Sequence, residues 1–572
     1  MATILKKHWA YLSILVLSFV VWKPLVSPGY FSMHDDQQIV RLAQLDKSLS
    51  FGQFPVRWVE DLGFGYGYPL FNFYPPLVYY LGEVFHLGLG ASFITSVKLV
   101  WLVALVGSGI AMYFLAKEFF GELGGLVSAL FYLYAPYHAV DAYVRGALAE
   151  LFSFVWLPLI LLFSYKIVRD RKWSWAVLTG IALGLLMITH NLIFLPFFGL
   201  LAIWHFSNVL IFDRQSILRN TLYWILYTAI ALSLTAFFWL PALVEKHYTL
   251  VDQLLIKNLA SYKIHFVCLG QLWTSPWGFG GSMAGCTDGM SFGVGKLYIL
   301  TSLVSFSVAV YLWFKGKKKI AAVLFAFWSL LLLSIFMTTE YSRIIWDWMS
   351  GLWYLQFPWR FLEFVALFTS LLAGSLVLIV NNKVQYILVG TLLVTLILVY
   401  GKHFQPQRNL TEATDDKLTT REQVKWYVSG QSFEYLPSGI ATKMTDLGVL
   451  WVDIDKNQIA KTKYEILRGD FIEEGQKFGP DRFRLVGRST TGATIEFQVT
   501  NFPGWRVWID GKEVSVTDKN KYKLITIEFP VGEHELHGRF TDTPVRTLGN
   551  TVSLLSVLTL ISGIYGARRN KN

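Results

Sequence analysis

Three adjacent polar residues, His34, Asp35 and Asp36, follow the first long apolar run of the chain. If that run crosses a membrane, these residues lie at the membrane surface, where water, lipid headgroups and protein meet. Carboxylates in such a place usually take part in catalysis or bind a cation. One aspartate could act as general base on an acceptor hydroxyl, or the pair could bind a divalent cation such as Mg²⁺ or Mn²⁺ through oxygen ligands. The structural alternative is a helix cap or an exposed acidic pair. Because adjacent carboxylates seldom face one point, we assign the base to Asp35 and leave Asp36 as metal ligand or structural neighbour.

A second polar stretch contains His138, Asp141, Arg145 and Glu150. If it is helical, the first three residues share one face at spacings of three and seven. A guanidinium group there suits a phosphate. Glu150 opens the next apolar run, where an ionisable group is expensive and usually functional. A salt bridge of Arg145 with Asp141 or Glu150 is the equally weighted structural interpretation.

Further candidates lie near other ends of apolar runs. Arg57 and Arg360 are additional candidate phosphate ligands, although Arg360 could instead anchor its helix at the membrane interface. A Gly-rich segment at residues 62–69 lacks the strand, the helix and the Lys-Ser/Thr ending of a nucleotide loop. Its aromatic side chains could stack on sugar rings or simply pack the loop. The candidate substrate-binding residues are His190, Glu245, Tyr66 and Tyr68 in these places, together with His138, Asp141 and Glu150 of the second polar stretch.

The elements that must position these residues are membrane helices. Of the 572 residues, 54% are hydrophobic and only 16% are charged, whereas soluble proteins carry about 25% charged residues. About twelve runs approach the roughly 20 apolar residues that cross a bilayer. The predicted spans are residues 9–26, 94–116, 122–137, 148–168, 173–188, 192–211, 221–240, 297–314, 320–337, 361–380, 384–400 and 550–565.

The basic residues set the predicted topology. If residues 74–90, interrupted by Glu83 and His86, form an interfacial helix, all basic tracts between spans fall on one side, as the positive-inside rule requires. We therefore expect a multi-pass plasma-membrane protein with both termini cytoplasmic and the first run retained as an anchor. The candidate catalytic residues then face outward. The formal charge of +11 lies largely in these tracts, which argues against nucleic-acid binding.

The sequence predicts a polytopic α-helical membrane protein with an extracytoplasmic β-sandwich near its C-terminus. We expect a transmembrane domain at residues 1–401, with its catalytic outer loop at 27–93, and a final helix with a basic tail at 550–572. Between them, residues 402–549 turn polar and alternating, and Asp510-Gly511 is a hairpin signal. Cys268 and Cys286 share one outer loop and form either a disulfide or two free thiols.

Together these features resemble the GT-C superfamily of membrane glycosyltransferases, in particular bacterial proteins labelled YfhO-like or 6-pyruvoyl-tetrahydropterin-synthase-related. The pterin label has no support, since no zinc-type histidine cluster is visible. The motifs that carry the resemblance are His34-Asp35, residues 54–58, 63–69, 143–150 and 434–437, and Pro503-Gly504-Trp505 with Asp510-Gly511.

The resemblance implies transfer of a sugar from a polyprenyl-phosphate donor to a glycan, lipid or protein acceptor on the outer face. It implies inversion, with Asp35 as base and a cation or arginine on the departing phosphate. The acidic residues are adjacent rather than spaced as in Asp-x-Asp, which leaves metal dependence open. Two other functions are alternatives. A transporter or flippase for envelope glycolipids would want mid-membrane charges and repeated broken helices, and a non-catalytic scaffold would bind polysaccharide through its β-sandwich.

Overall fold

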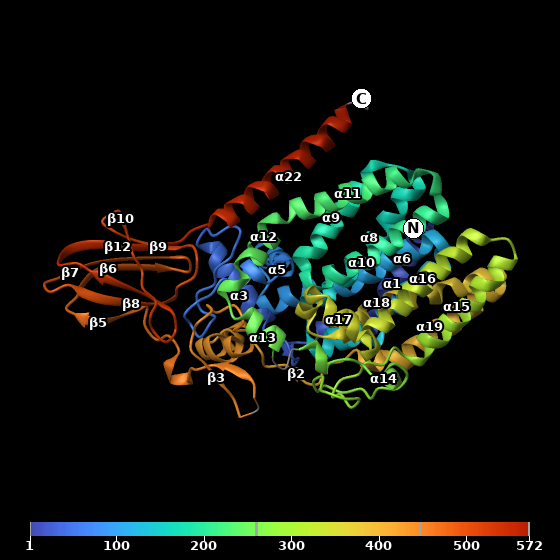
Figure 1. The fold of residues 1–572 in the computed structure, drawn as a ribbon. Helices are drawn as coiled ribbons and strands as arrows, with labels where there is room; N and C mark the ends of the chain where they lie inside the picture. The colour runs from blue at the N-terminus through green and yellow to red at the C-terminus, as the bar shows by residue number, and fades with distance from the viewer. Residues whose placement is uncertain (1, 258–260, 447, 570–572) are drawn as a thin grey trace. The chain divides into compact units, whose positions relative to one another are not determined.

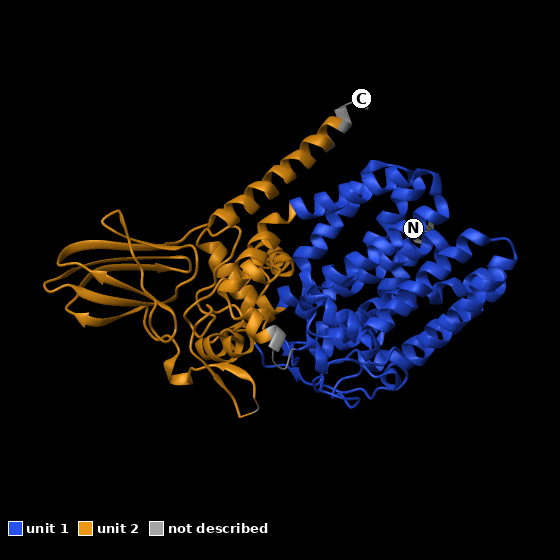
Figure 2. Ribbon diagram, in the orientation of Figure 1, with its two compact units in different colours: residues 1–36, 95–233, 261–413 blue, residues 37–94, 234–260, 414–572 orange. Residues whose placement is uncertain are grey.

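A computed structural model describes residues 2–257, 261–446 and 448–569 of the chain. These residues form two compact units, each assembled from separate stretches (Figure 2). The first unit comprises residues 1–36, 95–233 and 261–413, and the second comprises residues 37–94, 234–260 and 414–572.

Long apolar helices make up most of the first unit (Figure 1). A continuous apolar run folds as an α-helix in lipid, because the helix satisfies every backbone polar group internally. These helices are α1 (Ala2–Leu17), α6 (Phe93–Leu133), α8 (Leu148–Asp170), α9 (Trp173–Thr189), α10 (Asn191–Phe212), α11 (Ile217–Leu234), α15 (Lys296–Phe314), α16 (Lys318–Thr338), α18 (Leu362–Gly374) and α19 (Asn382–Tyr400). The short helix α2 (Phe19–Trp22) follows α1.

Nine helices of the described residues are long and apolar enough to cross a membrane, or ten if the bent pair 8–17 and 19–26 is one span. The chain is thus a multi-pass membrane protein, as predicted. The difference from twelve has two causes. Helix α6 contains two predicted spans, separated at Gly121, whose φ of 71° and ψ of −172° interrupt the helix. Helix α9 is helical as predicted but has only 17 residues.

Short elements of the first unit connect these helices and place polar residues at their ends. They are β1 (Tyr30–Phe31), which pairs with β2 (Asn409–Leu410), and α7 (Pro136–Ala139), the π-helix η2 (Val140–Arg145), α14 (Leu269–Trp273), α17 (Arg343–Trp348) and the 3₁₀ helix η8 (Pro358–Phe361).

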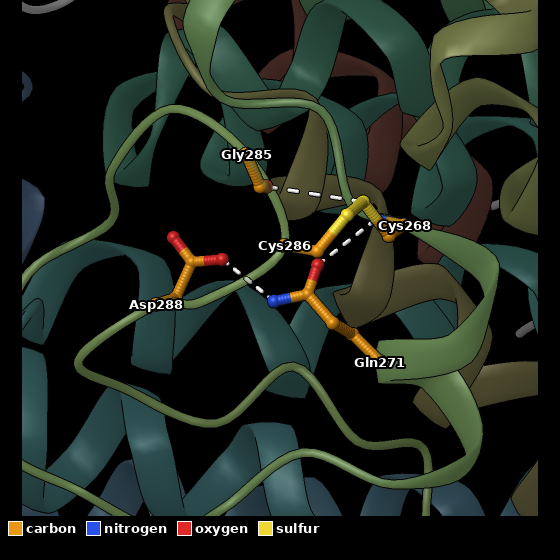
Figure 3. Close-up of a disulfide and its surroundings, with 5 residues drawn as sticks. All are labelled: Cys268, Gln271, Gly285, Cys286 and Asp288. Atoms are coloured by element: carbon orange, nitrogen blue, oxygen red, sulfur yellow. Dashed lines mark hydrogen bonds between the residues drawn. A yellow bond between two sulfur atoms is a disulfide. The ribbon is translucent and has the colours of Figure 1, made fainter.

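The two cysteines of the first unit form a disulfide within a long loop (Figure 3). The Cα atoms of Cys268 and Cys286 are 5.6 Å apart, inside the usual range for a bridge. Of the two alternatives that the sequence left open, the structure therefore contains the disulfide.

The second unit combines short helices with the predicted β-rich region. Its helices are α3 (Gln38–Ser50), α4 (Leu70–Phe73), α5 (Leu77–Leu89), α12 (Ala236–Glu245), α13 (Val251–Lys257), α20 (Asp415–Leu418), α21 (Ser429–Gln431) and α22 (Pro544–Arg569). Helix α5 lies in the segment expected to be interfacial. Its 13 residues rise about 20 Å, too little for a hydrocarbon layer of about 30 Å, and its location at the interface stays a prediction.

Two antiparallel sheets form the core of the β-rich region. The larger has the order β10-β9-β12-β7-β6 and the smaller the order β11-β8-β5. Phe483 of the larger sheet stacks on Phe497 of the smaller, with ring centroids 4.1 Å apart. The strands are β3 (Thr442–Met444), β4 (Leu450–Val452), β5 (Tyr464–Gly469), β6 (Ile472–Gly479), β7 (Arg482–Ser489), β8 (Ala493–Thr500), β9 (Trp505–Ile509), β10 (Lys512–Val514), β11 (Leu524–Phe529) and β12 (Gly532–Phe540).

The predicted hairpin at Asp510-Gly511 is confirmed. Ile509 of β9 pairs with Lys512 of β10, and the two turn residues have φ of 50° and 81°. Positive φ at both central positions is what a two-residue type I′ turn requires.

Candidate active site

The His34-Asp35 segment is hydrogen-bonded to the end of the π-helix η2. The backbone N–H of His34 donates to the Val144 carbonyl at 3.0 Å, and that of Asp35 donates to the Arg145 carbonyl at 2.8 Å. The π-helix ends at Gly146, with φ of 70°. A Cβ there would lie 2.2 Å from the sulfur of Met33, so glycine permits both the turn and the close approach. Two candidate motifs distant in sequence thus meet in the first unit.

Arg145 is buried among acidic and hydroxyl groups. Its guanidinium donates to Asp141, to Tyr137 Oη at 3.3 Å and to Glu150 Oε2 at 2.9 Å. It also lies over the ring of Trp359, 4.6 Å from the centroid. Both salt bridges that the sequence suggested as alternatives are therefore present. A π-helix at this position is typical of a functional site.

The Glu150 carboxylate joins most of the remaining candidates. Besides Arg145, it accepts a hydrogen bond from Tyr137 Oη at 2.6 Å. Arg360 Nε lies 3.1 Å and His190 Nε2 lies 3.8 Å from its Oε2. Three sequence-predicted residues, Arg145, His190 and Arg360, are thus collected around the carboxylate of a fourth, Glu150. We call this set, with Asp141 and Tyr137, the charge cluster.

The buried environment shifts the charge states of the cluster. Burial, reinforced by nearby Glu150, raises the pKa of Asp141 well above its usual value. Oδ2 of Asp141 has no hydrogen-bond partner among the described residues. Burial also lowers the pKa of His190 to about 3, so that this imidazole is neutral at physiological pH.

His138 faces away from the Asp141–Arg145 pair. Its Nδ1 is 3.0 Å from the Tyr132 carbonyl, and its ring stacks on Phe154 at 4.2 Å. Burial lowers its pKa to about 4. These contacts are those of a neutral core histidine, and its role in substrate binding stays a prediction.

The two aspartates and His34 have different surroundings. His34 is exposed, and its Nε2 lies 2.9 Å from the Phe279 carbonyl. Burial raises the pKa of Asp36. Asp35 is close enough to Asp141 for its charge to raise the pKa of Asp141 further. Among the described residues, no group of three or more His, Cys, Asp or Glu could hold a metal. A metal role for Asp35 and Asp36 stays a prediction, and we assign no reaction step to a cation.

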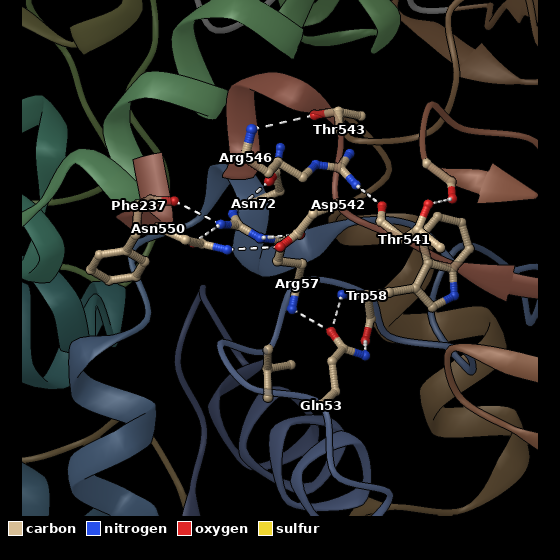
Figure 4. A network of polar contacts seen from close by, with 12 residues as sticks. Gln53, Arg57, Trp58, Asn72, Phe237, Thr541, Asp542, Thr543, Arg546 and Asn550 are labelled. Atoms are coloured by element: carbon tan, nitrogen blue, oxygen red, sulfur yellow. Dashed lines mark hydrogen bonds and ion pairs between the residues drawn. The ribbon is translucent and has the colours of Figure 1, made fainter. Parts of the chain in front are cut away.

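Arg57 and Glu245 belong to the second unit. Figure 4 shows the polar contacts around Arg57. Arg57 donates to Asn72 Oδ1 at 2.8 Å and to Asn550 Oδ1 at 2.8 Å, and burial lowers its pKa to about 10. Glu245 accepts from Asn72 at 2.9 Å and from Arg546 Nε at 3.0 Å. These contacts connect α4, α12 and α22, so a structural role explains why a charged residue stands at each of the two positions. Their predicted roles with substrate stay predictions.

Tyr66 and Tyr68 also belong to the second unit, where both are buried. The Tyr66 hydroxyl donates to the Gln458 carbonyl at 2.5 Å, and its ring stacks on Tyr522. The Tyr68 hydroxyl donates to the Ser432 carbonyl at 2.8 Å. These contacts are those of loop packing, the alternative that the sequence also offered, and sugar stacking stays a prediction.

Several members of the site carry weak sequence signals. Tyr137 and Trp359 are uncharged aromatics in a chain rich in them, and nothing marked their contacts with Arg145. Glu363 is fully buried in the first turn of α18 and accepts from Ser153 at 2.5 Å. The signal that singled out Glu150, an ionisable residue opening an apolar span, applies equally to Glu363.

Comparisons with known proteins bear on the first unit most directly. Residues 74–240 match the family model described as dolichyl-phosphate-mannose-protein mannosyltransferase. This range includes Asp141, Arg145, Glu150 and His190 of the site. No curated protein matches the chain.

Solved structures with similar chains include two transferases. The apo oligosaccharyltransferase of Archaeoglobus fulgidus is 14% identical, with a TM-score of 0.40, over 70% of this chain and 56% of that chain. A mycobacterial arabinofuranosyltransferase is 14% identical, with a TM-score of 0.39, over 70% of this chain and 27% of that chain. The chain thus spans about half of the archaeal enzyme and about a quarter of the mycobacterial one, and likeness at this level carries no information on activity. The family match is confined to residues 74–240, so the GT-C-type and YfhO-like affinities of the whole chain stay predictions.

Proposed function

We propose that the protein transfers a sugar from a polyprenyl-phosphate donor to an acceptor hydroxyl or amide at the extracytoplasmic face of the membrane. One observation carries the proposal: the backbone hydrogen bonds from His34 and Asp35 to residues 144 and 145 join a carboxylate-bearing segment to a cluster with two arginines. The family matched by residues 74–240 is named for a dolichyl-phosphate-linked mannose, which supports a lipid phosphate as the leaving group.

Arg360 is the better candidate for the phosphate, and Arg145 is the residue that positions the cluster. Arg145 already donates to Asp141, Glu150 and Tyr137. Among the described residues, Arg360 donates to the Leu355 carbonyl at 2.9 Å and forms an ion pair with one carboxylate, that of Glu150 at 3.1 Å. Its Nε has no hydrogen-bond partner among the described residues. The Arg360 guanidinium therefore keeps a donor that suits an anionic phosphate.

The chemistry is a direct displacement at the anomeric carbon. Asp35 takes the proton of the acceptor group as its oxygen or nitrogen forms a bond to that carbon. The bond from carbon to the phosphate oxygen breaks, and its electron pair leaves with the polyprenyl phosphate, which Arg360 stabilises. A single displacement inverts the anomeric configuration. The phosphate is a good leaving group, so no separate general acid is needed.

The orientation of this site follows from charge. The basic tracts between spans assign both termini to the cytoplasm by the positive-inside rule. Residues 34–36 and 138–147 then lie on the outer face, and so do the strands of residues 442–540. Lipid-linked sugars are the activated donors suited to that face, where nucleotide sugars are scarce.

Transfer by the purified protein in lipid vesicles tests the proposal. The probe is polyprenyl-phosphate mannose with a radiolabelled sugar, and membranes of the expressing cell supply acceptors. We expect Asp35→Asn to lower transfer by about 10²- to 10⁴-fold, the usual contribution of a general base, with unchanged unfolding temperature. Asp36→Asn is the matched control and should retain most activity. Full transfer by Asp35→Asn would refute the base, and absence of transfer by the wild type from any polyprenyl-phosphate sugar would refute the function.

A further inference from the structure

We propose that the disulfide-closed loop 268–286 is a positioning element for His34, and that His34 accepts a hydrogen bond from a substrate hydroxyl through Nδ1. This inference rests on the proposed function, because it places His34 beside the general base Asp35. The starting observation is the 2.9 Å contact between His34 Nε2 and the carbonyl oxygen of Phe279, in the middle of that loop.

The contact determines which nitrogen of the neutral imidazole carries the proton. A carbonyl oxygen can only accept a hydrogen bond, so Nε2 must be the donor. The proton therefore resides on Nε2, and Nδ1 carries the lone pair. An acceptor nitrogen recognises a hydroxyl or amide donor and cannot donate to a phosphate. His34 in this state suits the acceptor substrate or the transferred sugar rather than the lipid phosphate.

Close backbone pairing holds the Phe279 carbonyl in place. Phe279 forms an antiparallel bridge with Met290. The Gly280 N–H donates to the Gly289 carbonyl at 2.8 Å, and the Gly289 N–H donates to the Gly281 carbonyl at 2.9 Å. A Cβ on Gly289 would lie 2.7 Å from the Cα of Gly280. Any larger residue at position 289 must therefore push the strand that carries Phe279 away.

The ends of the loop are fixed by covalent and polar contacts (Figure 3). Besides the disulfide, Asp288 accepts from Gln271 Nε2 at 2.7 Å and from the Met283 backbone N–H at 2.8 Å. Gln271 Oε1 accepts from the backbone N–H of Cys268 at 2.9 Å. The disulfide and these bonds restrict the conformations of the loop between its ends. The loop can therefore hold the Phe279 carbonyl in one position relative to His34.

Two neighbouring glycines provide a matched pair of variants. Gly289→Ala must disturb the backbone pairing, whereas a Cβ on Gly281 meets no atom within 4 Å, so Gly281→Ala is the control. The first measurement is the rate at which diethyl pyrocarbonate modifies His34, followed by mass spectrometry. We expect Gly289→Ala to raise that rate about two- to tenfold, as loss of one hydrogen bond predicts, and Gly281→Ala to leave it unchanged.

The second measurement is sugar transfer by the same variants, with and without His34→Ala. We expect Gly289→Ala to lower transfer in the wild-type background and to have no further effect when His34 is already alanine. Additive losses in the two backgrounds would overturn the positioning role, because the loop would then act independently of His34. Equal modification rates for Gly289→Ala and Gly281→Ala would overturn it as well.

The disulfide itself is tested by Cys268→Ser combined with Cys286→Ser. We expect faster modification of His34 and a loss of transfer that depends on His34. Because this variant could fail to fold, the two glycine variants decide the question if it does. If neither Asp35→Asn nor His34→Ala changes transfer, the roles of both residues fail, whereas absence of transfer by the wild type refutes the proposed function. In either case the modification rates still test the contact between loop and histidine.

Discussion

Replacement of Glu150 by glutamine tests whether the charge cluster is a single electrostatic unit. The variant keeps the shape of the side chain and removes its charge. In the structure the carboxylate lies 2.8 Å from Arg145 Nη1 and 3.1 Å from Arg360 Nε, and it accepts from Tyr137 at 2.6 Å. Because Glu150 is fully buried, water cannot replace the lost charge.

The expected loss of stability is large. Removal of one partner of a buried ion pair costs about 3–5 kcal/mol, because the other charge stays buried without compensation. The matched control is Glu340→Gln. Glu340 pairs with Arg343, but their side chains are 67% and 44% exposed, and such surface pairs contribute only about 0–1 kcal/mol.

Thermal unfolding of the purified protein in one detergent measures both variants. We expect Glu150→Gln to lower the unfolding midpoint several times more than Glu340→Gln. Adding Arg145→Gln to Glu150→Gln should recover part of the loss, since the second change removes the uncompensated cation. Equal shifts for the two glutamate variants, or a double variant that loses the sum of the single effects, would refute the cluster as a coupled unit.

Two further predictions concern the second unit. Burial, with a smaller contribution from Asp46, raises the pKa of Glu83 from 4.5 to about 8. The folded state therefore binds the Glu83 proton more tightly than the unfolded state, and the free energy of unfolding falls as pH rises from 4.5 to 8. Glu83→Gln should therefore raise the unfolding midpoint at pH 9 and change it little at pH 4, and parallel profiles would contradict the shift. Arg546→Met leaves Glu245 buried without its partner at 2.9 Å and should cost about 3–5 kcal/mol. Arg506→Met, in an exposed pair at 3.8 Å, is its control, and equal losses would contradict the account.

The helices and strands were largely predictable because their signals are local. Twelve apolar runs were expected, and each corresponds to helical backbone in the structure. The Asp510-Gly511 turn was predictable because positive φ restricts the residue types that a short hairpin accepts. The separation of α6 at Gly121 was also visible, as a boundary between two runs.

The contacts within the site were less predictable because they join distant residues. Sequence indicated that His34, Arg145 and Arg360 stand near ends of spans, but not that Arg360 forms an ion pair with Glu150 or that Phe279 meets His34. The i, i+4 contact between Asp141 and Arg145 follows from local spacing.

The roles of uncharged residues were the hardest to predict. Tyr137 carries no charge signal, and its contact with Glu150 depends on the turn at Gly146 between η2 and α8. The polar network around Arg57 joins residues almost 500 positions apart, such as Asn550. No local pattern in the sequence encodes such a pairing.

The location of bound donor tests the central claim most directly. A structure of the protein in lipid nanodiscs with polyprenyl phosphate, determined by electron cryomicroscopy, would show the phosphate. The account predicts phosphate density in contact with the Arg360 guanidinium, with the Asp35 carboxylate facing the position of the sugar. A phosphate bound elsewhere, with Arg360 still held only by Glu150 and the Leu355 carbonyl, would contradict it.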